Sequence, residues 1–291
     1  MKIIVLGSGT SHGIPVAGCS CPVCTSNDER DKRMRSSVYI EGQDGERVLI
    51  DAGPEFRLQA IRAGISRLDG ILLTHSHADH LHGLDDLRPF SCAKPIPVYG
   101  NAETISEMKE RFSYIFKITQ NGGGKPKLIP NIADETIHIG GLTITPVPVK
   151  HGELDILGWE ISETTVKETQ TQENVSRSFL YLTDVSEIPP ASITQLSNRN
   201  SDMARIIIIG SLRMRPHETH FSFDEALAAA LALGPSAVYL THICHNHSHG
   251  EIEEICRAFR EKHQTLPKQA LADNIEKIEI HPAQDGLELI L

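Results

Sequence analysis

The sequence has no long apolar run. No stretch of its 291 residues approaches the roughly 18 consecutive apolar residues of a membrane-spanning helix. The first residues, MKIIVLGSGTSHG, contain a short apolar run that is too brief and too rich in glycine for a signal peptide. We therefore interpret this run as a first strand, and we expect a cytoplasmic protein that makes no membrane contact.

Positive charge is also scarce. The chain carries 28 Lys and Arg against 38 Asp and Glu, which gives a formal net charge of -10. An extended nucleic-acid groove needs a basic surface, so this balance argues against extended nucleic-acid binding. The same balance is compatible with a small anionic substrate held by metal ions.

Apolar runs typical of strands recur along the chain, and several of them end in His, Asp or Gly. These runs lie at 3–7, 37–41, 47–53, 70–75, 142–149, 178–184, 204–211 and 237–242. Helical patterns lie between them, at 55–63, 101–113, 222–233 and 249–262. The third helix has a clear start, because Ser222 and Glu225 form a capping-box pattern. This mixture predicts an α/β layered domain with helices outside packed sheets.

The chain is expected to form a single domain over 1–291. The segment 162–178 is polar with few apolar residues. We interpret it as an insertion, either an exposed hairpin tip or a loop between two strands.

The run THSHADH at 74–80 carries the strongest chemical signal. It follows an apolar strand and places His75, His77, Asp79 and His80 within six residues. Packing does not explain such a cluster, since each buried titratable group costs free energy unless it has a partner. His75 and His77 would share one face of an extended chain, and Asp79 and His80 can converge on a second point after a turn. Imidazole and carboxylate ligands suit Zn, Mn or Fe, so the run predicts two metal ions.

Three further donors follow later strands. His151, Asp184 and His242 each stand at the end of an apolar run, where loops gather to form a site. A carboxylate such as Asp184 can bridge two cations, which a neutral imidazole does not do. A water between two divalent ions loses a proton near neutral pH, so this site needs no Ser or Cys nucleophile.

These residues, in this order, resemble the signature of metallo-β-lactamase-fold hydrolases. The resemblance covers nearly the whole chain and implies an αββα sandwich with the metals at one sheet edge. It implies that His75, His77 and His151 hold one metal, that Asp79, His80 and His242 hold the other, and that Asp184 bridges them. Asp79 would also orient the attacking water.

A second candidate metal site lies in the segment CSCPVC. The chain has only six cysteines, and Cys19, Cys21 and Cys24 are clustered within the loop at 18–25. Three thiolates at this spacing predict a structural zinc that lacks one ligand. The candidate fourth ligand is His245, in THICHNHSH, with Cys244, His247 and His249 as competitors.

A cysteine loop after the first strand, together with T-H-x-x-H near the end of the chain, resembles the PhnP-type phosphodiesterases. This resemblance implies that His242 is catalytic and His245 structural. It also implies a general-acid histidine in the loop MRPHETHFSFDEAL, for which His220 is the first choice and His217 the second. Arg213 and Arg215, at the start of this loop, either contact a phosphate or form a solvated basic pair.

The sequence thus predicts a dinuclear metal-dependent phosphodiesterase that acts on small phosphodiesters or cyclic phosphates. Its cofactors would be two divalent ions (Mn, Zn or Fe) and one structural zinc. The alternatives are a thioesterase of the glyoxalase II type or a ribonuclease on the same scaffold, and a non-catalytic metal- or ligand-binding protein. A homodimer is left open.

Overall fold

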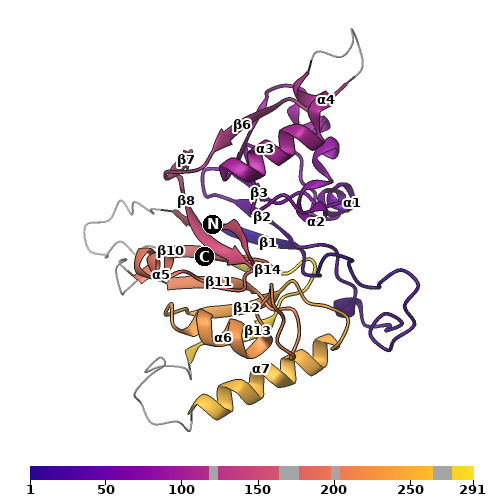
Figure 1. Ribbon diagram of the computed structural model, residues 1–291, viewed down its shortest axis with the longest axis vertical. Helices are drawn as coiled ribbons and strands as arrows, with labels where there is room; N and C mark the ends of the chain where they lie inside the picture. The colour runs from indigo at the N-terminus through magenta and orange to yellow at the C-terminus, as the bar shows by residue number, and fades with distance from the viewer. Residues whose placement is uncertain (118–123, 164–176, 198–203, 265–276) are drawn as a thin grey trace.

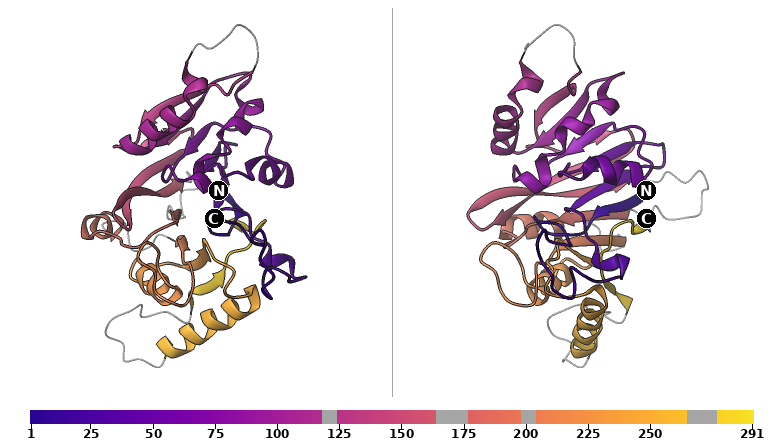
Figure 2. Two further views of the ribbon diagram at one scale, coloured as in Figure 1. Left: turned by 45° about the vertical axis from the view of Figure 1, so that its right-hand side comes forward. Right: turned by 90° about the vertical axis from the view of Figure 1, so that its right-hand side faces the viewer.

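The structure is a computed structural model of residues 1–291, and it describes residues 1–117, 124–163, 177–197, 204–264 and 277–291. Two seven-stranded mixed sheets pack face to face, and helices cover their outer faces (Figures 1 and 2). The predicted αββα sandwich is therefore confirmed. Among the described residues, no helix is both long and apolar enough to cross a membrane.

The first sheet has the strand order β14-β1-β2-β3-β4-β5-β6. Its strands are β1 (Lys2–Gly7), β2 (Ser37–Glu41), β3 (Arg47–Ile50), β4 (Gly70–Leu72), β5 (Ile96–Gly100), β6 (Leu128–Ile132) and β14 (Glu288–Ile290). Strands β3 to β6 run parallel, whereas β14, β1, β2 and β3 pair antiparallel. The outer face of this sheet carries α1 (Phe56–Arg62), α2 (Ala78–Leu81), α3 (Ala102–Arg111) and α4 (Ser113–Phe116). Three short 3-10 helices lie at Glu29–Asp31, Leu84–Leu87 and Pro89–Ser91.

The second sheet has the order β13-β12-β11-β10-β9-β8-β7. Its strands are β7 (Ile137–Ile139), β8 (Leu142–His151), β9 (Leu154–Glu163), β10 (Arg177–Leu182), β11 (Ala204–Gly210), β12 (Ala237–Thr241) and β13 (Glu279–Pro282). Strands β10 to β13 are parallel. The helices on this side are α5 (Pro190–Ser197), α6 (Phe223–Leu231) and α7 (His249–Gln264).

Side chains alternate between the two faces of each strand, and this alternation builds three apolar layers. In β11, Ile206 and Ile208 belong to the core between the sheets, together with Trp159 and Phe179. Ile207 and Ile209 point the other way, because successive side chains of a strand face opposite sides of the sheet. There they pack with residues of α6 and α7. This two-sided burial explains the unbroken apolar run of β11, as expected for a central parallel strand.

All four predicted helices are present as α1, α3, α6 and α7, and each predicted strand run contains a strand. The capping box at α6 is also confirmed: Ser222 accepts a hydrogen bond from the backbone of Glu225, and the Glu225 side chain accepts one from the backbone of Ser222. Of the polar segment at 162–178, the first two residues end β9 and the last two begin β10. The remainder lies outside the described residues.

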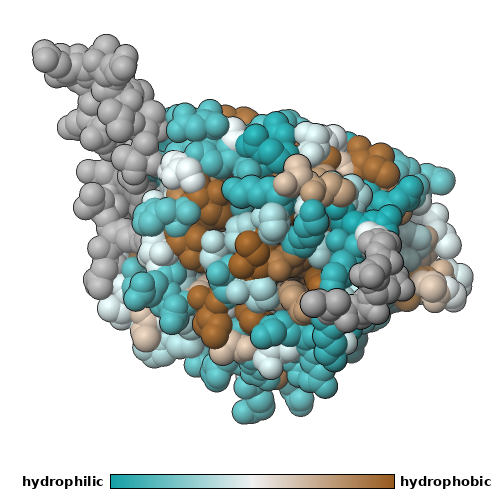
Figure 3. Space-filling model, turned by 90° about the horizontal axis from the view of Figure 1, so that it is seen from above, coloured by the Kyte–Doolittle hydropathy of each residue, from teal (hydrophilic) through white to brown (hydrophobic). Residues whose placement is uncertain are grey.

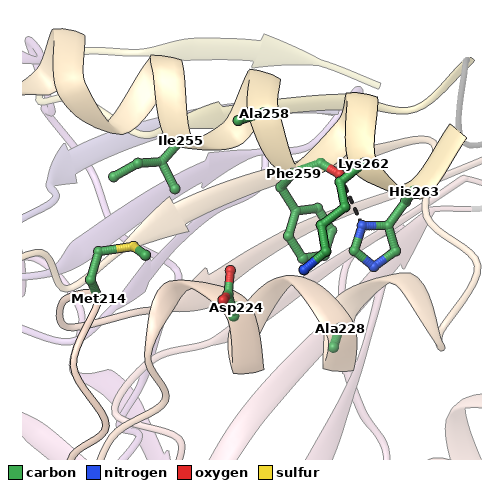
Figure 4. A pocket seen from close by; sticks show the side chains of 8 residues that line it. All are labelled: Met214, Asp224, Ala228, Ile255, Ala258, Phe259, Lys262 and His263. Atoms are coloured by element: carbon green, nitrogen blue, oxygen red, sulfur yellow. Dashed lines mark hydrogen bonds between the residues drawn. The ribbon is translucent and has the colours of Figure 1, made fainter. Parts of the chain in front are cut away.

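A groove lies on the outer surface between α6 and α7. A cavity of about 430 Å³ lies there, lined by apolar side chains such as Ile255 and Phe259 and by Asp224 and Lys262 (Figure 4). The His263 ring stacks on Phe259 at one end, with ring centroids 4.0 Å apart. On the face seen from above, apolar side chains lie scattered among polar ones (Figure 3), as is ordinary for a folded protein surface.

Candidate metal centre

The predicted metal ligands meet where strands from both sheets end. Leu72 ends β4 shortly before His75, Leu182 ends β10 two residues before Asp184, and Thr241 ends β12 just before His242. His151 is the last residue of β8. Parallel neighbouring strands bring their carboxyl ends to one edge, which is where sites form in α/β sheets.

The donors fall into two groups. His75, His77 and His151 form the first, with ligand atoms within 4.8 Å of one another. Their rings lie edge-on, with the centroids of His75 and His77 separated by 4.5 Å. Asp79, His80, Asp184 and His242 form the second group under the same distance limit. The structure thus brings together all seven residues singled out in the sequence.

Asp184 lies between the two groups. Its Oδ2 is 3.9 Å from His75 Nε2 on one side. Its Oδ1 is 3.1 Å from His242 Nε2 and 3.3 Å from His80 Nε2 on the other. Burial alone would raise the pKa of Asp184, but His242 and His80 hold that pKa well below its usual range. The side chain is therefore an ionised carboxylate that faces both donor groups.

The donor nitrogens fit a metal ion. Nε2 of His75, Nε2 of His80 and both ring nitrogens of His242 are buried, and none has a hydrogen-bond partner among the described residues. A buried polar atom without a partner is costly, so such a cluster needs a ligand. Burial lowers the pKa of His75 well below its usual value, and a neutral imidazole is the form that binds a metal. The mixture of imidazole and carboxylate suits Zn, Mn or Fe.

Two groups that the sequence reasoning missed orient these ligands. His80 Nδ1 donates to Asp51 Oδ2 over 2.7 Å, and both side chains are fully buried. His151 Nδ1 donates to the carbonyl oxygen of Thr219 over 2.7 Å. Each bond fixes the ring so that Nε2 faces the metal site. Asp51 could have been predicted from the sequence, because it follows the apolar strand β3 just as the other donors follow their strands. The Thr219 carbonyl could not, because every residue has a backbone carbonyl.

The backbone is strained at this site. Asp51, Asp184 and His242 have φ values of 60°, 53° and 56°. Among the described residues these are the non-glycine positions with positive φ. Each one follows the end of a strand, and such left-handed conformations persist where the surroundings hold them and often mark functional sites.

His220, the predicted general acid, lies against the predicted metal ligands. Its ring centroid is 4.6 Å from that of His151 and 4.9 Å from that of His242. It also forms a third donor group with His151 and Asp184, so it is close enough to act as a ligand itself. Burial and the charge of His242 lower the pKa of His220 to about 3. His217, the second choice, is exposed and lies farther out, with its ring centroid 5.3 Å from that of His220.

The cysteine loop forms a separate donor group with His245. The Sγ atoms of Cys19, Cys21 and Cys24 lie 3.4, 3.5 and 3.4 Å from His245 Nδ1. A tetrahedral zinc with sulfur and nitrogen ligands would separate these atoms by about 3.5 Å. The competitors are engaged elsewhere: Cys244 Sγ contacts Asn246, the His247 ring packs near Phe223, and His249 lies beside Glu253. His245 is thus the residue that the structure adds to the three cysteines.

Comparison with known proteins now defines the class. Residues 46–243 match the family described as the beta-lactamase superfamily domain, and the chain belongs to this family of metallo-hydrolases. It is similar to a solved diphosphatase of the PhnP family, with 36% identity, a TM-score of 0.76 and coverage of 99% of this chain and 96% of that one. The resemblance inferred from the sequence is confirmed. Zinc-bound PqqB from Methylobacterium extorquens shares the fold over the whole of both chains, with a TM-score of 0.72 at 17% identity.

Curated relatives carry several different names. The whole chain is 34% identical to 52% of an octanoyltransferase from Porphyromonas gingivalis. Half of it is 29% identical to 60% of the coenzyme PQQ synthesis protein B of Methylobacterium radiotolerans. It is 31% identical to ribonuclease Z of a Bradyrhizobium strain over 40% of either chain. The chain spans 52% and 60% of the length of the first two of these curated relatives.

Proposed function

We propose that this protein is a dinuclear metal-dependent phosphodiesterase that hydrolyses small phosphodiesters or cyclic phosphates. One observation carries the proposal: the carboxylate of Asp184 belongs to one donor group and also faces the other, and the imidazole of His220 lies beside both. This arrangement would place two ions beside one phosphoryl group. The similar PhnP-family diphosphatase supports phosphoryl chemistry at such a site.

In this proposal the two donor groups would hold two ions, and these would supply an activated water and stabilisation of the charge on the phosphoryl oxygens. The new bond joins the water oxygen to phosphorus, and the bond from phosphorus to the leaving oxygen breaks. The protein's own residues hold the ligands and supply the proton for that leaving oxygen. Asp51 and the Thr219 carbonyl fix the ligand rings, and Asp79 orients the attacking water.

His220 is the proposed proton donor. With a pKa of about 3 its imidazole is neutral near pH 7, so it must first gain a proton. A bound anionic substrate favours the charged imidazole and raises this pKa, because an opposite charge nearby stabilises the protonated form. His217 is the alternative donor, from its exposed position on the same loop.

Other substrates on the same scaffold are the competing proposals. A diphosphate linkage differs from a diester only in its leaving group, and the PhnP-family relative favours testing it. The match to ribonuclease Z is shorter, and the net charge of -10 argues against extended RNA binding. The cysteine site weighs against a glyoxalase II-type thioesterase. The complete donor set weighs against a non-catalytic protein.

A substrate panel tests the proposal. The protein, loaded in turn with Mn, Zn or Fe, is assayed on bis(p-nitrophenyl) phosphate, cyclic nucleotides, a nucleoside diphosphate, p-nitrophenyl phosphate and a glutathione thioester. We expect the diesters to be the best substrates and Asp184→Ala to remove their turnover. Turnover of the thioester alone, or of no substrate with any metal, would exclude the proposal.

A further inference from the structure

A hollow opens beside the run of predicted metal ligands. Its volume is about 590 Å³, and the residues that line it are Ala78, His82, Arg111 and Phe112. Ala78 stands between His77 and Asp79, which belong to different donor groups. The hollow therefore borders the candidate metal centre, although none of the seven predicted ligands lines it.

Two parts of the chain supply the walls of this hollow. Ala78 begins α2 and His82 follows its last residue, and the backbone N–H of His82 donates to the carbonyl of Ala78 over 3.0 Å. Residues four apart in a helical turn share one face, so both side chains point to the same side. Arg111 ends α3, and Phe112 is the residue that separates α3 from α4. The hollow thus lies between α2 and the junction of α3 with α4.

Two contacts place the side chain of Arg111. Its Nη1 donates to the carbonyl oxygen of Ser76 over 2.5 Å, and its Nη2 donates to Glu107 Oε2 over 2.5 Å. Ser76 stands between His75 and His77, so this arginine ties the end of α3 to the run of predicted ligands. Glu107 is its counter-ion, so the guanidinium needs no further anion. A guanidinium held in this way can still stack its flat face on a planar ring.

The other two polar or aromatic walls are rings. The ring centroids of His82 and Phe112 are 6.0 Å apart, and the ring planes meet at 76°. Phe112 is half-buried and packs against the core beneath it, whereas His82 is exposed. Rings set at this angle form a corner, so a flat ligand ring can stack on one of them while its edge meets the other. Ala78, with its small side chain, leaves room for such a ring.

The hollow and the proposed proton donor border different parts of the metal centre. The ring of His220 packs on those of His151 and His242, and neither of these two residues is next to Ala78 in the chain. A substrate whose leaving oxygen faces His220 can therefore place another part of its structure in the hollow.

We propose that this hollow binds an aromatic ring of the substrate, and that Phe112 and His82 are the residues that select for it. The inference rests on the proposed function, because it takes the phosphoryl group to lie at the metal centre. The substrate class is then a small phosphodiester or cyclic phosphate that carries a nucleobase. The base stacks on Phe112, and its edge meets His82.

Two substrates that differ only in the base test this inference. Adenosine 2′,3′-cyclic phosphate and 1-O-methylribose 2,3-cyclic phosphate are compared by kcat/KM in the wild type, Phe112→Leu, Phe112→Tyr and His82→Ala. Leucine keeps an apolar contact with the core but has no ring, whereas tyrosine keeps the ring. His138→Ala is the matched control for His82→Ala, because His138 is also exposed and does not line the hollow. Binding of adenosine 3′-monophosphate to the metal-loaded proteins is measured by calorimetry, which needs no turnover.

We expect the wild type to prefer the adenosine substrate. Phe112→Leu should reduce that preference about five- to hundred-fold, mainly through KM, and should weaken binding of adenosine 3′-monophosphate to a similar degree. Phe112→Tyr should keep the preference, His82→Ala should lose part of it, and His138→Ala should leave it intact. Equal turnover of both substrates by the wild type, or an unchanged preference in Phe112→Leu, would overturn the inference while leaving the proposed function in place. Absence of turnover together with Phe112-dependent binding of the monophosphate would instead overturn the proposed function.

Discussion

His80 donates a hydrogen bond to Asp51 over 2.7 Å, and both side chains are completely buried. The carboxylate fixes the proton of His80 on Nδ1 and leaves Nε2 free toward Asp79 and Asp184. Thr74 holds Asp51 in turn, since its backbone N–H and its hydroxyl both donate to the carboxylate over 2.8 Å. One buried carboxylate thus sets the tautomer of a candidate metal ligand.

We predict that Asp51→Asn weakens metal binding about ten- to hundred-fold, although the change is nearly isosteric. The new amide can donate to His80 Nδ1, which would shift the ring proton to Nε2 and block the ligand nitrogen. Chelator competition with the purified protein measures the affinity. Asp44→Asn, at an exposed position, is the control. Wild-type affinity in Asp51→Asn would show that Asp51 does not set the tautomer.

We predict that Cys21→Ser lowers the melting temperature by several degrees and affects activity only as a consequence. The cysteine loop and His245 are 224 residues apart along the chain, so a shared zinc would join distant segments. Cys92→Ser is the matched control, because Cys92 is exposed and belongs to no donor group among the described residues. Elemental analysis should find about one zinc fewer per chain in Cys21→Ser. An unchanged melting temperature in Cys21→Ser would show that this site does not stabilise the fold.

We predict that His220→Ala costs far more on an unactivated diester than on bis(p-nitrophenyl) phosphate. A sugar alkoxide needs a proton to leave, whereas p-nitrophenolate does not, and general acid catalysis contributes about a hundred- to ten-thousand-fold. Metal content must be measured in parallel, because His220 lies within ligand range of His151 and Asp184. If His220→Ala lost equal activity on both substrates with full metal occupancy, the proton donor would be His217. If it lost equal activity and also lost metal, His220 would be a metal ligand.

We predict that Asp285 makes the protein less stable as the pH rises from about 4 through 6. Burial raises the pKa of this carboxyl to about 6 from the 3.8 of an exposed aspartate, although the backbone N–H groups of Met34 and Ser8 donate to it. A group whose pKa is raised by folding stabilises the protein below its unfolded pKa and loses that contribution above its folded pKa, here on the order of 2 to 3 kcal/mol.

Urea unfolding of the wild type and of Asp285→Asn at pH 4.5 and pH 7 checks this prediction. Between pH 4.5 and pH 7 the unfolding free energy of the wild type should fall relative to that of Asp285→Asn. Other titrating groups are common to both proteins and cancel in this comparison. Asp285→Asn should also be destabilised, since its amide group meets the N–H donors of Ser8 or Met34. A difference that stays constant between the two pH values would contradict the raised pKa.

The sequence alone determined the fold class and the main donors. Apolar runs that end in His or Asp locate His75, His151, Asp184 and His242, because strand periodicity and the type of side chain are local properties. The spacing in THSHADH marks a metal site for the same reason. Local sequence did not show which of His245, His247 and His249 lies beside the three cysteines. Only the folded structure shows that it is His245.

Tertiary structure alone decided the relationships between distant segments. The partnership of Asp51 with His80 and that of Thr219 with His151 join loops from different strands, and no spacing along the chain encodes them. Local pattern fixes which residue types are available, and packing fixes which of them meet.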